Sequence, residues 1–315
     1  MIRILKEKGV VIKSTGSWYV VKTTKDEFVD CRIKGRFRIK GIRSTNPVAV
    51  GDKVRFIRTV DNTGVISDIE ERENYIIRKA TKLSKASHII AANIDQAYLI
   101  VTMVKPRTSR GFIDRFLVTT EAYHVPCSII FNKIDIYDKE TLELHNNLVN
   151  LYTSLGYPCY SVSAITGENI DDLKDNLKGK TTLMSGHSGV GKSALINSLD
   201  GELDLRTGDL SDVHEKGKHT TTFAEMFELG FGAKIVDTPG VKEFGLFDFD
   251  RKEVAERFPE FRNEMKHCKF SNCSHVHEPG CAVVEAVKEG RIDIVRYQNY
   301  ISIINDDYFE LKEWD

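Results

Sequence analysis

The sequence predicts a multidomain α/β protein with a small β-barrel, a doubly wound parallel sheet and a helical tail. Short strand patterns separated by turn residues fill residues 1–72. From about residue 95, apolar strands alternate with helical patterns, which is typical of a sheet covered on both faces. The 315 residues of the chain also exceed the roughly 150 of one ordinary domain, so more than one core is expected.

The composition excludes several classes of protein. The chain is 41% hydrophobic and 29% charged with only 7 prolines, so it is neither disordered nor of low complexity. No apolar run reaches the roughly 18 residues of a membrane helix. Charged residues interrupt the apolar stretch at residues 1–8, which is not typical of a signal peptide. We therefore expect a soluble, cytoplasmic protein without membrane contacts.

Residues 1–72 are expected to form the barrel. The predicted strands are Gly9–Ser14, Trp18–Thr23, Phe28–Ile33, Val54–Val60 and Gly64–Ile69. Turn residues such as Asn46-Pro47 and Asp61-Asn62 separate them. Five short strands of this kind favour a barrel of the OB type.

The charge of the chain is distributed unevenly. Residues 1–80 carry 18 Lys and Arg against 10 Asp and Glu, whereas the remainder carries 27 against 36. The densest basic run consists of Arg32, Lys34, Arg36, Arg38, Lys40 and Arg43. Alternating positions lie on one face of a strand, and a basic face suits a phosphate backbone, so we expect RNA binding by the barrel. An ordinary solvated sheet face would give the same pattern.

The doubly wound domain is assigned to residues 80–246. Ala97–Val104 and Val125–Phe131 are buried strands, and Phe112–Ala122 and Lys139–Leu155 are helices. The strand and helix alternation continues with Cys159–Val162, Ile170–Leu177, Thr181–Met184, Lys192–Leu199, Phe223–Leu229 and Lys234–Val236. Residues 247–315 form the tail, with helical segments at Ala282–Glu289 and Ile292–Asn305.

A glycine-rich loop lies between a predicted strand and a predicted helix. It consists of Gly186, His187, Ser188, Gly189, Val190, Gly191, Lys192 and Ser193, and Ala194 follows at the start of the helix. Glycines let backbone N–H groups surround phosphate oxygens at a helix N-terminus. Lys192 supplies a cation near the β- and γ-phosphates, and the Ser193 hydroxyl can hold Mg²⁺. The sequence therefore predicts a nucleotide site that includes Ala194.

A second motif, Asp237-Thr238-Pro239-Gly240, follows the strand Lys234–Val236. Asp237 would lie beside the phosphate loop, where it can contact Mg²⁺ in the second coordination sphere, and Gly240 lets a backbone N–H approach the γ-phosphate. By itself such a stretch is usually a turn. The phosphate loop favours the functional interpretation.

The choice of base is predicted by Asn132-Lys133-Ile134-Asp135 at the end of another strand. The Asp135 carboxylate can accept hydrogen bonds from the N1–H and the N2 amine of guanine, donors that adenine lacks. A polar loop is the ordinary alternative, but Ser163-Ala164 follows the next strand and supplies the companion loop over the guanine O6. Asp135 also argues against a P-loop ATPase or kinase, so GTP and GDP are the expected ligands.

These motifs occur in an unusual order. In an ordinary GTPase the phosphate loop precedes the base-specificity segments, whereas here Asn132–Asp135 and Ser163-Ala164 come before Gly186–Ser193. Circular permutation is tolerated because the ends of a compact domain lie close together. The sequence thus predicts a circularly permuted P-loop GTPase domain whose last motif leads directly into the tail.

The tail contains a cluster of metal-ligand residues. Cys268, Cys273, His275 and Cys281 have the spacing C-x4-C-x-H-x5-C. Three thiolates and one imidazole form a closed tetrahedral set of the kind that holds structural zinc, one ion per chain. Buried reduced cysteines are the alternative, and His267 and His277 are rival imidazoles.

The permuted motifs, flanked by a basic barrel and a metal cluster, resemble the ribosome-associated GTPases of the RsgA (YjeQ or YloQ) family over essentially the whole chain. Further similar stretches are Gly217–Thr222, Val241–Leu246 and Glu278–Val283. The resemblance implies a bacterial factor, expected to be a monomer, that assists late maturation of the 30S subunit and binds its 16S rRNA. It also implies GTP hydrolysis stimulated by that subunit, release after hydrolysis, and zinc on Cys268, Cys273, His275 and Cys281.

The catalytic group is less evident. Val241 stands after Gly240, where many GTPases carry a water-orienting Gln, so slow turnover is expected for the isolated protein. His219 is the candidate for positioning the attacking water, although a solvated loop histidine would look the same. Among the threonines 220–222 we favour Thr221 as the Mg²⁺ contact. A GTP-gated RNA-binding module with negligible turnover is the alternative function.

Overall fold

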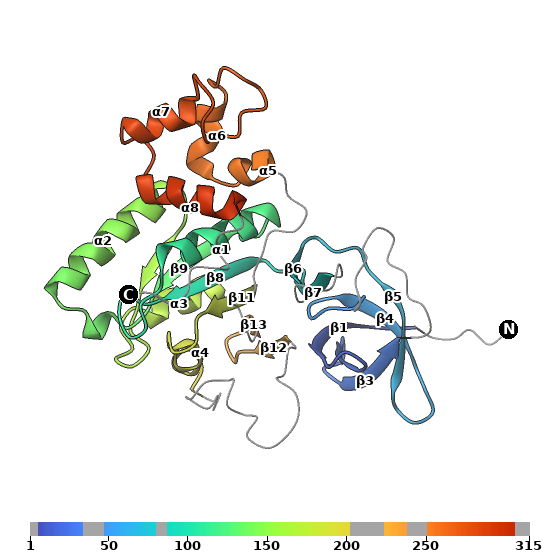
Figure 1. Cartoon of the computed structure of the whole chain (residues 1–315). Coiled ribbons are helices and arrows are strands. Elements are labelled where there is room, and N and C mark those ends of the chain that lie inside the picture. Colours follow the sequence, from blue (N-terminus) through green and yellow to red (C-terminus); the bar gives the residue numbers. More distant parts are fainter. Residues whose placement is uncertain (1–5, 34–46, 80–86, 202–223, 238–250, 306–315) are drawn as a thin grey trace, which may run out of the picture.

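The computed structural model describes residues 6–33, 47–79, 87–201, 224–237 and 251–305. These residues form a barrel, an α/β domain and a helical C-terminal domain (Figure 1). The predicted fold class is confirmed. Within these ranges no helix combines the length and the apolar character needed to span a bilayer.

The barrel consists of five strands: β1 (Glu7–Ser14), β2 (Tyr19–Thr23), β3 (Phe28–Ile33), β4 (Lys53–Arg58) and β5 (Gly64–Ile69). Their order is β1-β2-β3-β5-β4, and β4 also pairs with β1, so the sheet closes. Alternate side chains fill the interior, among them Val21, Val29 and Phe56. The predicted strands are confirmed, with some ends shifted by one or two residues. For example, β4 stops at Arg58 rather than Val60, because a turn then begins at Thr59.

Strand β1 contains a bulge that gives it two roles. Its register with β2 shifts between Val11 and Lys13. Val11 belongs to the barrel interior, whereas Ile12 packs against the core of the α/β domain. Successive side chains of a strand point to opposite faces, so β1 contributes to two cores. The bulge shifts this alternation, so that Ser14 rather than Lys13 is the next buried residue.

A hairpin that the sequence analysis missed joins the barrel to the α/β domain. It consists of β6 (Tyr75–Lys79) and β7 (Ser87–Ala92), which pair antiparallel. The Ala92 N–H donates to the Val50 carbonyl at 2.8 Å. Gly51 has φ +91°, and a Cβ on it would lie 2.0 Å from the Ala92 carbonyl oxygen. Only glycine therefore permits the barrel to approach the hairpin this closely.

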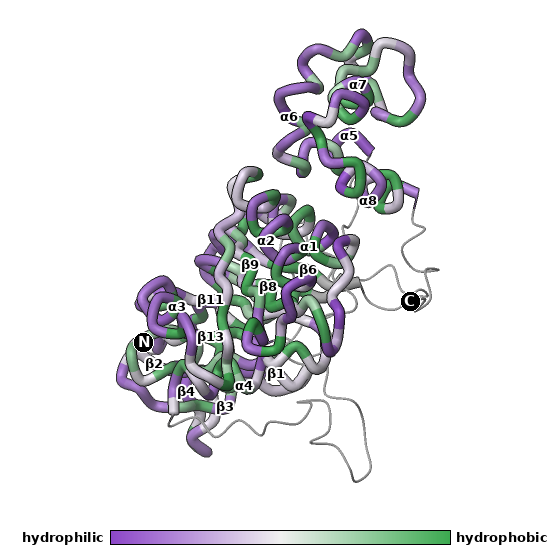
Figure 2. The backbone as a smooth tube through the Cα atoms, turned by 90° about the vertical axis from the view of Figure 1, so that its left-hand side faces the viewer, coloured by the Kyte–Doolittle hydropathy of each residue, from purple (hydrophilic) through white to green (hydrophobic). Residues whose placement is uncertain are grey.

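The α/β domain has three layers. Its sheet has the order β10-β9-β8-β11-β13-β12. The strands are β8 (Gln96–Val101), β9 (Cys127–Phe131), β10 (Cys159–Ser161), β11 (Thr181–Gly186), β12 (Glu225–Glu228) and β13 (Lys234–Asp237). Neighbouring strands are parallel except for the edge strand β12, which is antiparallel to β13. Figure 2 shows β8 and β9 as largely hydrophobic segments.

Two helices cover each face of the sheet. Helices α1 (Arg110–Ala122) and α2 (Lys139–Ser154) pack with the side of β8 that carries Leu99. Helices α3 (Ile170–Leu177) and α4 (Lys192–Leu199) pack with the opposite side, where Tyr98 and Ile100 point. A short 3₁₀ turn, η1 (Ile134–Ile136), follows β9. The strand predicted to extend to Val104 ends at Val101, because the chain turns there and Thr102 N–H donates to the Thr108 hydroxyl.

The C-terminal domain has four helices among the described residues: α5 (Arg251–Glu256), α6 (Pro259–Met265), α7 (Ala282–Lys288) and α8 (Ile294–Ile304). Helices α7 and α8 correspond to the predicted segments, whereas α5 and α6 were not predicted. Figure 1 shows α8 lying against α1, and Val118 of α1 belongs to the core of this domain.

A buried ion-pair network fastens the C-terminal domain to α1. Arg296 of α8 has a relative exposure of 0%, and its Nη1 lies 2.7 Å from Asp114 Oδ1. Its Nε donates to Glu260 Oε1 at 2.6 Å, and the Tyr152 hydroxyl donates to Asp114 at 2.8 Å. Although desolvation opposes the charged form, the two carboxylates keep the pKa of Arg296 above its ordinary value.

Candidate functional site

The glycine-rich loop follows β11, which lies between β8 and β13 in the sheet. Gly189 and Gly191 have φ values of +81° and +89°. A Cβ on Gly191 would lie 2.5 Å from Asn132 Nδ2, and one on Gly186 would lie 2.6 Å from the Ile100 carbonyl oxygen. Glycine is therefore required at both contacts, and the loop reaches the N-terminus of α4 in a shape that can surround a phosphate.

Lys192 and Asp237 lie beside each other at this end of the sheet. Asp237 is the last residue of β13, and Lys192 is the first residue of α4. Their side chains form an ion pair and have relative exposures of only 14% and 8%. A phosphate in the loop can accept hydrogen bonds from the Lys192 ammonium group and leave the Asp237 carboxylate available to a hydrated cation.

The base-specificity segments meet the phosphate loop. Asn132 Nδ2 donates to the Val190 carbonyl at 2.8 Å, and Lys133 Nζ donates to the Gly189 carbonyl at 2.6 Å. The Ala164 N–H donates to Asn132 Oδ1 at 3.1 Å. Three segments far apart in the sequence thus converge at the carboxyl end of the sheet, where open α/β domains bind their ligands.

The Asp135 carboxylate is held by its neighbour in the companion loop. The Ser163 hydroxyl donates to Asp135 Oδ1 at 2.6 Å and accepts a hydrogen bond from the Thr166 N–H at 3.1 Å. Partial burial lowers the pKa of Lys133, an effect that the charge of Asp135 opposes. The Ser163 hydroxyl thus links the Asp135 carboxylate to the companion loop.

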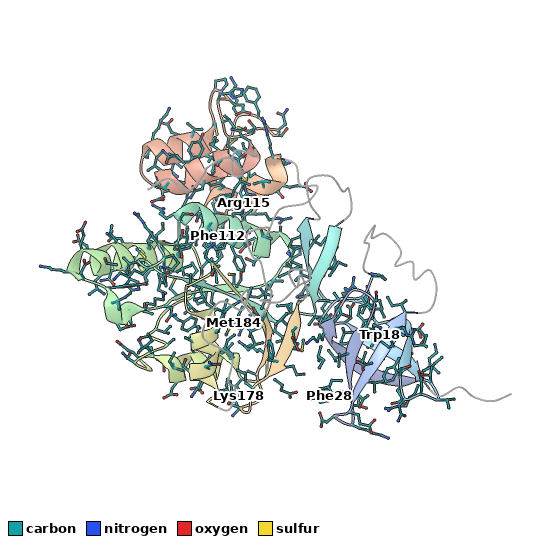
Figure 3. All side chains as sticks on the ribbon, turned by 60° about the horizontal axis from the view of Figure 1, so that its bottom comes forward. Trp18, Phe28, Phe112, Arg115, Lys178 and Met184 are labelled. Carbon is teal, nitrogen blue, oxygen red and sulfur yellow. The ribbon has the colours of Figure 1, made fainter. Side chains whose placement is uncertain are left out.

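Two contacts at the site were missed by the sequence analysis. The Tyr137 hydroxyl donates to the Asn132 carbonyl at 2.8 Å, and burial raises the pKa of Tyr137 to about 12. The rings of His187 and Phe112 have centroids 3.8 Å apart. Phe112, labelled in Figure 3, lies on α1, so the phosphate loop touches the helix that also carries Asp114. Nothing in the sequence distinguishes Phe112 from the other apolar residues of that helix.

The structure brings together the predicted nucleotide-site residues that it describes. Their roles in binding stay predictions. The remaining candidates, Gly240, His219 and Thr221, lie outside the described residues, as does the basic run after Arg32.

The predicted metal ligands form one cluster in the C-terminal domain. One ligand atom from each of Cys268, Cys273, His275 and Cys281 lies within 4.8 Å of the others. His275 Nδ1 is 3.5 Å from Cys281 Sγ and 3.6 Å from Cys268 Sγ. Tetrahedral zinc with ordinary bond lengths separates such ligand atoms by roughly 3.5–3.8 Å. The four residues could therefore hold a zinc ion.

The loop around the cluster is held from both sides. Glu278 accepts hydrogen bonds from the Ser274 N–H at 2.8 Å and the Val276 N–H at 3.1 Å. The Tyr297 hydroxyl of α8 donates to the His275 carbonyl at 2.8 Å. Burial raises the pKa of the Cys273 thiol, which favours the protonated form when no cation is bound. Among the described residues, neither His267 nor His277 joins the cluster.

The phosphate loop follows a central strand of a doubly wound sheet, and the base-specificity segments that converge with it come earlier in the sequence. This order defines a circularly permuted P-loop GTPase domain. Comparison with known proteins agrees. The family model of the RsgA GTPase matches residues 69–247, and the family model of the RsgA N-terminal domain matches residues 8–66. The chain belongs to the RsgA GTPase family.

Relatives and solved structures cover nearly the whole chain. The small ribosomal subunit biogenesis GTPase RsgA of Bacteroides fragilis is 54% identical over 299 residues, which are 95% of this chain and 96% of that protein. The protein of the same name from Christiangramia forsetii is 52% identical, with 95% and 96% covered. The crystal structure of YjeQ from Thermotoga maritima has a TM-score of 0.76 at 34% identity and covers 96% of this chain and 98% of that one. The circularly permuted GTPase YloQ has a TM-score of 0.72 at 27% identity, with 100% and 99% covered.

Proposed function

We propose that this chain is a GTPase that binds the 30S ribosomal subunit and assists its late maturation, hydrolysing GTP to GDP and phosphate with stimulation by the subunit. The observation that carries the proposal is that Asn132 and Lys133 contact the phosphate loop while Ala164 contacts Asn132. The names of the relatives support the subunit as the partner. We further propose that the chain acts as a monomer in the cytoplasm and that it contacts 16S rRNA.

We propose that separate groups of residues at the nucleotide site bind the base, the phosphates and Mg²⁺. Asp135 and Ala164 would bind the guanine edge, and Asn132 would hold the two loops in register. The backbone of residues 186–194, which includes Ser188, would surround the phosphates, with Lys192 as the cation. Ser193 would hold Mg²⁺ with Asp237 in the second sphere, where the ion neutralises charge that develops on the phosphates.

The catalytic residue is proposed from the sequence. His219 is the candidate for positioning the attacking water, Thr221 is the candidate second Mg²⁺ contact, and the Gly240 N–H would approach the γ-phosphate. All three lie outside the described residues. The absence of a Gln after Gly240 supports a slow intrinsic rate that the subunit must raise.

GTP turnover with and without purified 30S or 50S subunits tests the function. We expect a low rate alone, a large increase with 30S and little change with 50S. Tight GTP binding with no turnover under any condition would instead favour the alternative, a GTP-gated RNA-binding module. A separate titration with ATP checks that the nucleotide bound is a guanine nucleotide.

Loss of the metal is expected to loosen the C-terminal domain and leave nucleotide binding largely intact, because a structural zinc site supplies local folding energy. Elemental analysis should find zinc in the native chain and a strong loss of it in Cys273→Ser. Hydrogen exchange should rise in residues 251–305 of this variant, while GTP affinity changes little. Cys159→Ser, which removes a cysteine outside the cluster, is the control and should keep its zinc. A native chain purified without chelator and free of zinc would contradict the assignment.

The barrel is expected to bind RNA with strong salt dependence, because neutralised phosphates release counterions. Groups on the described part of the barrel support this role: the exposed Arg32 guanidinium lies 4.2 Å from the Trp18 ring centroid, and Phe28 is 65% exposed. Figure 3 labels both aromatic residues on the barrel.

Charge reversal at Arg36 and Arg38 should weaken 30S association and lower the salt slope by about one per lost phosphate contact, without changing GTP affinity. Binding of labelled subunits at several salt concentrations measures both. Reversal of two exposed lysines of the α/β domain, Lys139 and Lys178, produces the same change in charge and serves as the control. Equal effects of the two double variants would mean that the basic run is only a solvated face.

A further inference from the structure

The barrel and the α/β domain share one continuous sheet. Strand β1 of the barrel pairs with β12, the edge strand of the α/β domain, so eleven strands are connected. In Figure 1, β12 and β13 lie next to the barrel at β1. A sheet edge that would otherwise face solvent is thus partly covered by another domain of the same chain.

The register of the strands aligns the barrel with the phosphate site. Lys13 of β1 lies opposite Glu225 of β12, and Glu225 lies opposite Asp237 of β13. Asp237 in turn forms the ion pair with Lys192 of the phosphate loop. Directly opposed residues of neighbouring strands point to the same face, so one row of charged side chains runs from the barrel to the nucleotide site.

Two ion pairs fix β12 to the barrel. Lys13 Nζ lies 3.0 Å from Glu225 Oε1, and Lys22 of β2 forms an ion pair with Glu228. The two acidic residues stand at the beginning and the end of β12, which has only four residues. A strand this short, paired with β1 and held by an ion pair at each end, is coupled to the position of the barrel.

We infer that Glu225 and Glu228 are positioning residues for the phosphate site. Through Lys13 and Lys22 they fix β12 to the barrel. RNA bound on the barrel then alters the placement of Asp237 and raises the rate of GTP hydrolysis. The inference rests on the proposed function. Its physical basis is that paired strands form a contiguous element between two sites, and a coupling free energy between two sites acts in both directions.

The double variant Glu225→Gln and Glu228→Gln tests this inference because it removes the ion pairs and leaves every basic residue of the barrel in place. We expect the 30S-stimulated rate to fall about fivefold or more, with little change in GTP affinity. The affinity for 30S should also become less dependent on whether GDP or a non-hydrolysable GTP analogue is bound. A purely structural role would not produce this second change.

Two comparisons make the result specific. Asp68→Asn breaks an exposed ion pair between two residues of the barrel domain, in which Lys6 Nζ lies 2.6 Å from Asp68 Oδ2. This variant should retain full stimulation of GTP hydrolysis by 30S. The exchanged pair Lys13→Glu with Glu225→Lys should recover stimulation relative to Glu225→Lys alone, because it restores an ion pair at the same place.

Full stimulation of the double glutamine variant would overturn the inference. So would a loss of stimulation accompanied by an equal loss of GTP affinity or by a lower unfolding temperature, because either result would indicate general damage. The proposed function fails in a different way. In that case the unmodified chain itself shows no stimulation by 30S, before any variant is compared.

Discussion

The Asp135→Asn variant is expected to lose at least about 100-fold in GTP affinity and to prefer xanthosine triphosphate. The carboxylate can accept hydrogen bonds from the N1–H and the N2 amine of guanine, whereas an amide presents one acceptor and one donor. The amide donor would face the guanine amine without a partner, and a buried unpaired group is costly. Xanthine carries a carbonyl at that position and complements the amide.

Titration of the full chain with GTP, xanthosine triphosphate and ATP measures the preference. Asp138→Asn is a matched control three residues along the chain: Asp138 caps α2 by accepting from the Thr141 N–H, a role that Asn performs equally well. The control should bind GTP normally. Equal affinity of the unmodified chain for ATP and GTP would contradict the assignment of Asp135 to base selection.

Arg296→Met is expected to reduce the free energy of unfolding of the C-terminal domain by about 3–5 kcal/mol, because it leaves Asp114 and Glu260 buried without their cation. Denaturant unfolding, followed by hydrogen exchange in α8, measures the loss. The control is Arg291→Met, which removes ion pairs of a half-exposed arginine with Glu264 and Glu289 and should cost far less, because solvent screens exposed ion pairs.

Neutralising the carboxylates in the same chain distinguishes unpaired charge from lost packing. Adding Asp114→Asn and Glu260→Gln to Arg296→Met should recover part of the lost free energy, since the uncompensated charges are then gone. If Arg296→Met costs no more than Arg291→Met, the network does not hold the C-terminal domain to α1 in the way that its burial indicates.

Elements with strong local patterns were predictable from the sequence. The alternation of Val29, Cys31 and their neighbours defines β3, and the apolar run of β8 defines a strand covered on both faces. The hairpin of β6 and β7 was missed because its position depends on the close approach of Gly51 to Ala92, which no local pattern encodes. Helices α5 and α6, of 6 and 7 residues, are too short for a periodic signal.

In the candidate site, too, residues with a local sequence pattern were predictable and residues defined by tertiary contacts were not. Lys192, Asp135 and the four candidate metal ligands could be predicted because their chemistry requires particular residue types at fixed spacing. The ring contact of His187 with Phe112 was not, since a tertiary contact between two segments chooses one apolar residue among many. Glu225 is hidden for a related reason: an acidic residue on an edge strand is ordinary until the register places it between Lys13 and Asp237.

The bulge at Ile12 limits how freely the barrel can be exchanged between proteins. Because Val11 fills the barrel and Ile12 contributes to the neighbouring core, deleting one residue from β1 would move Lys13 toward an apolar environment. A barrel whose first strand lacks this extra residue could not satisfy both cores at once. The two domains are therefore not interchangeable modules. Substitutions in β1 are constrained by the core of the α/β domain as well as by the core of the barrel.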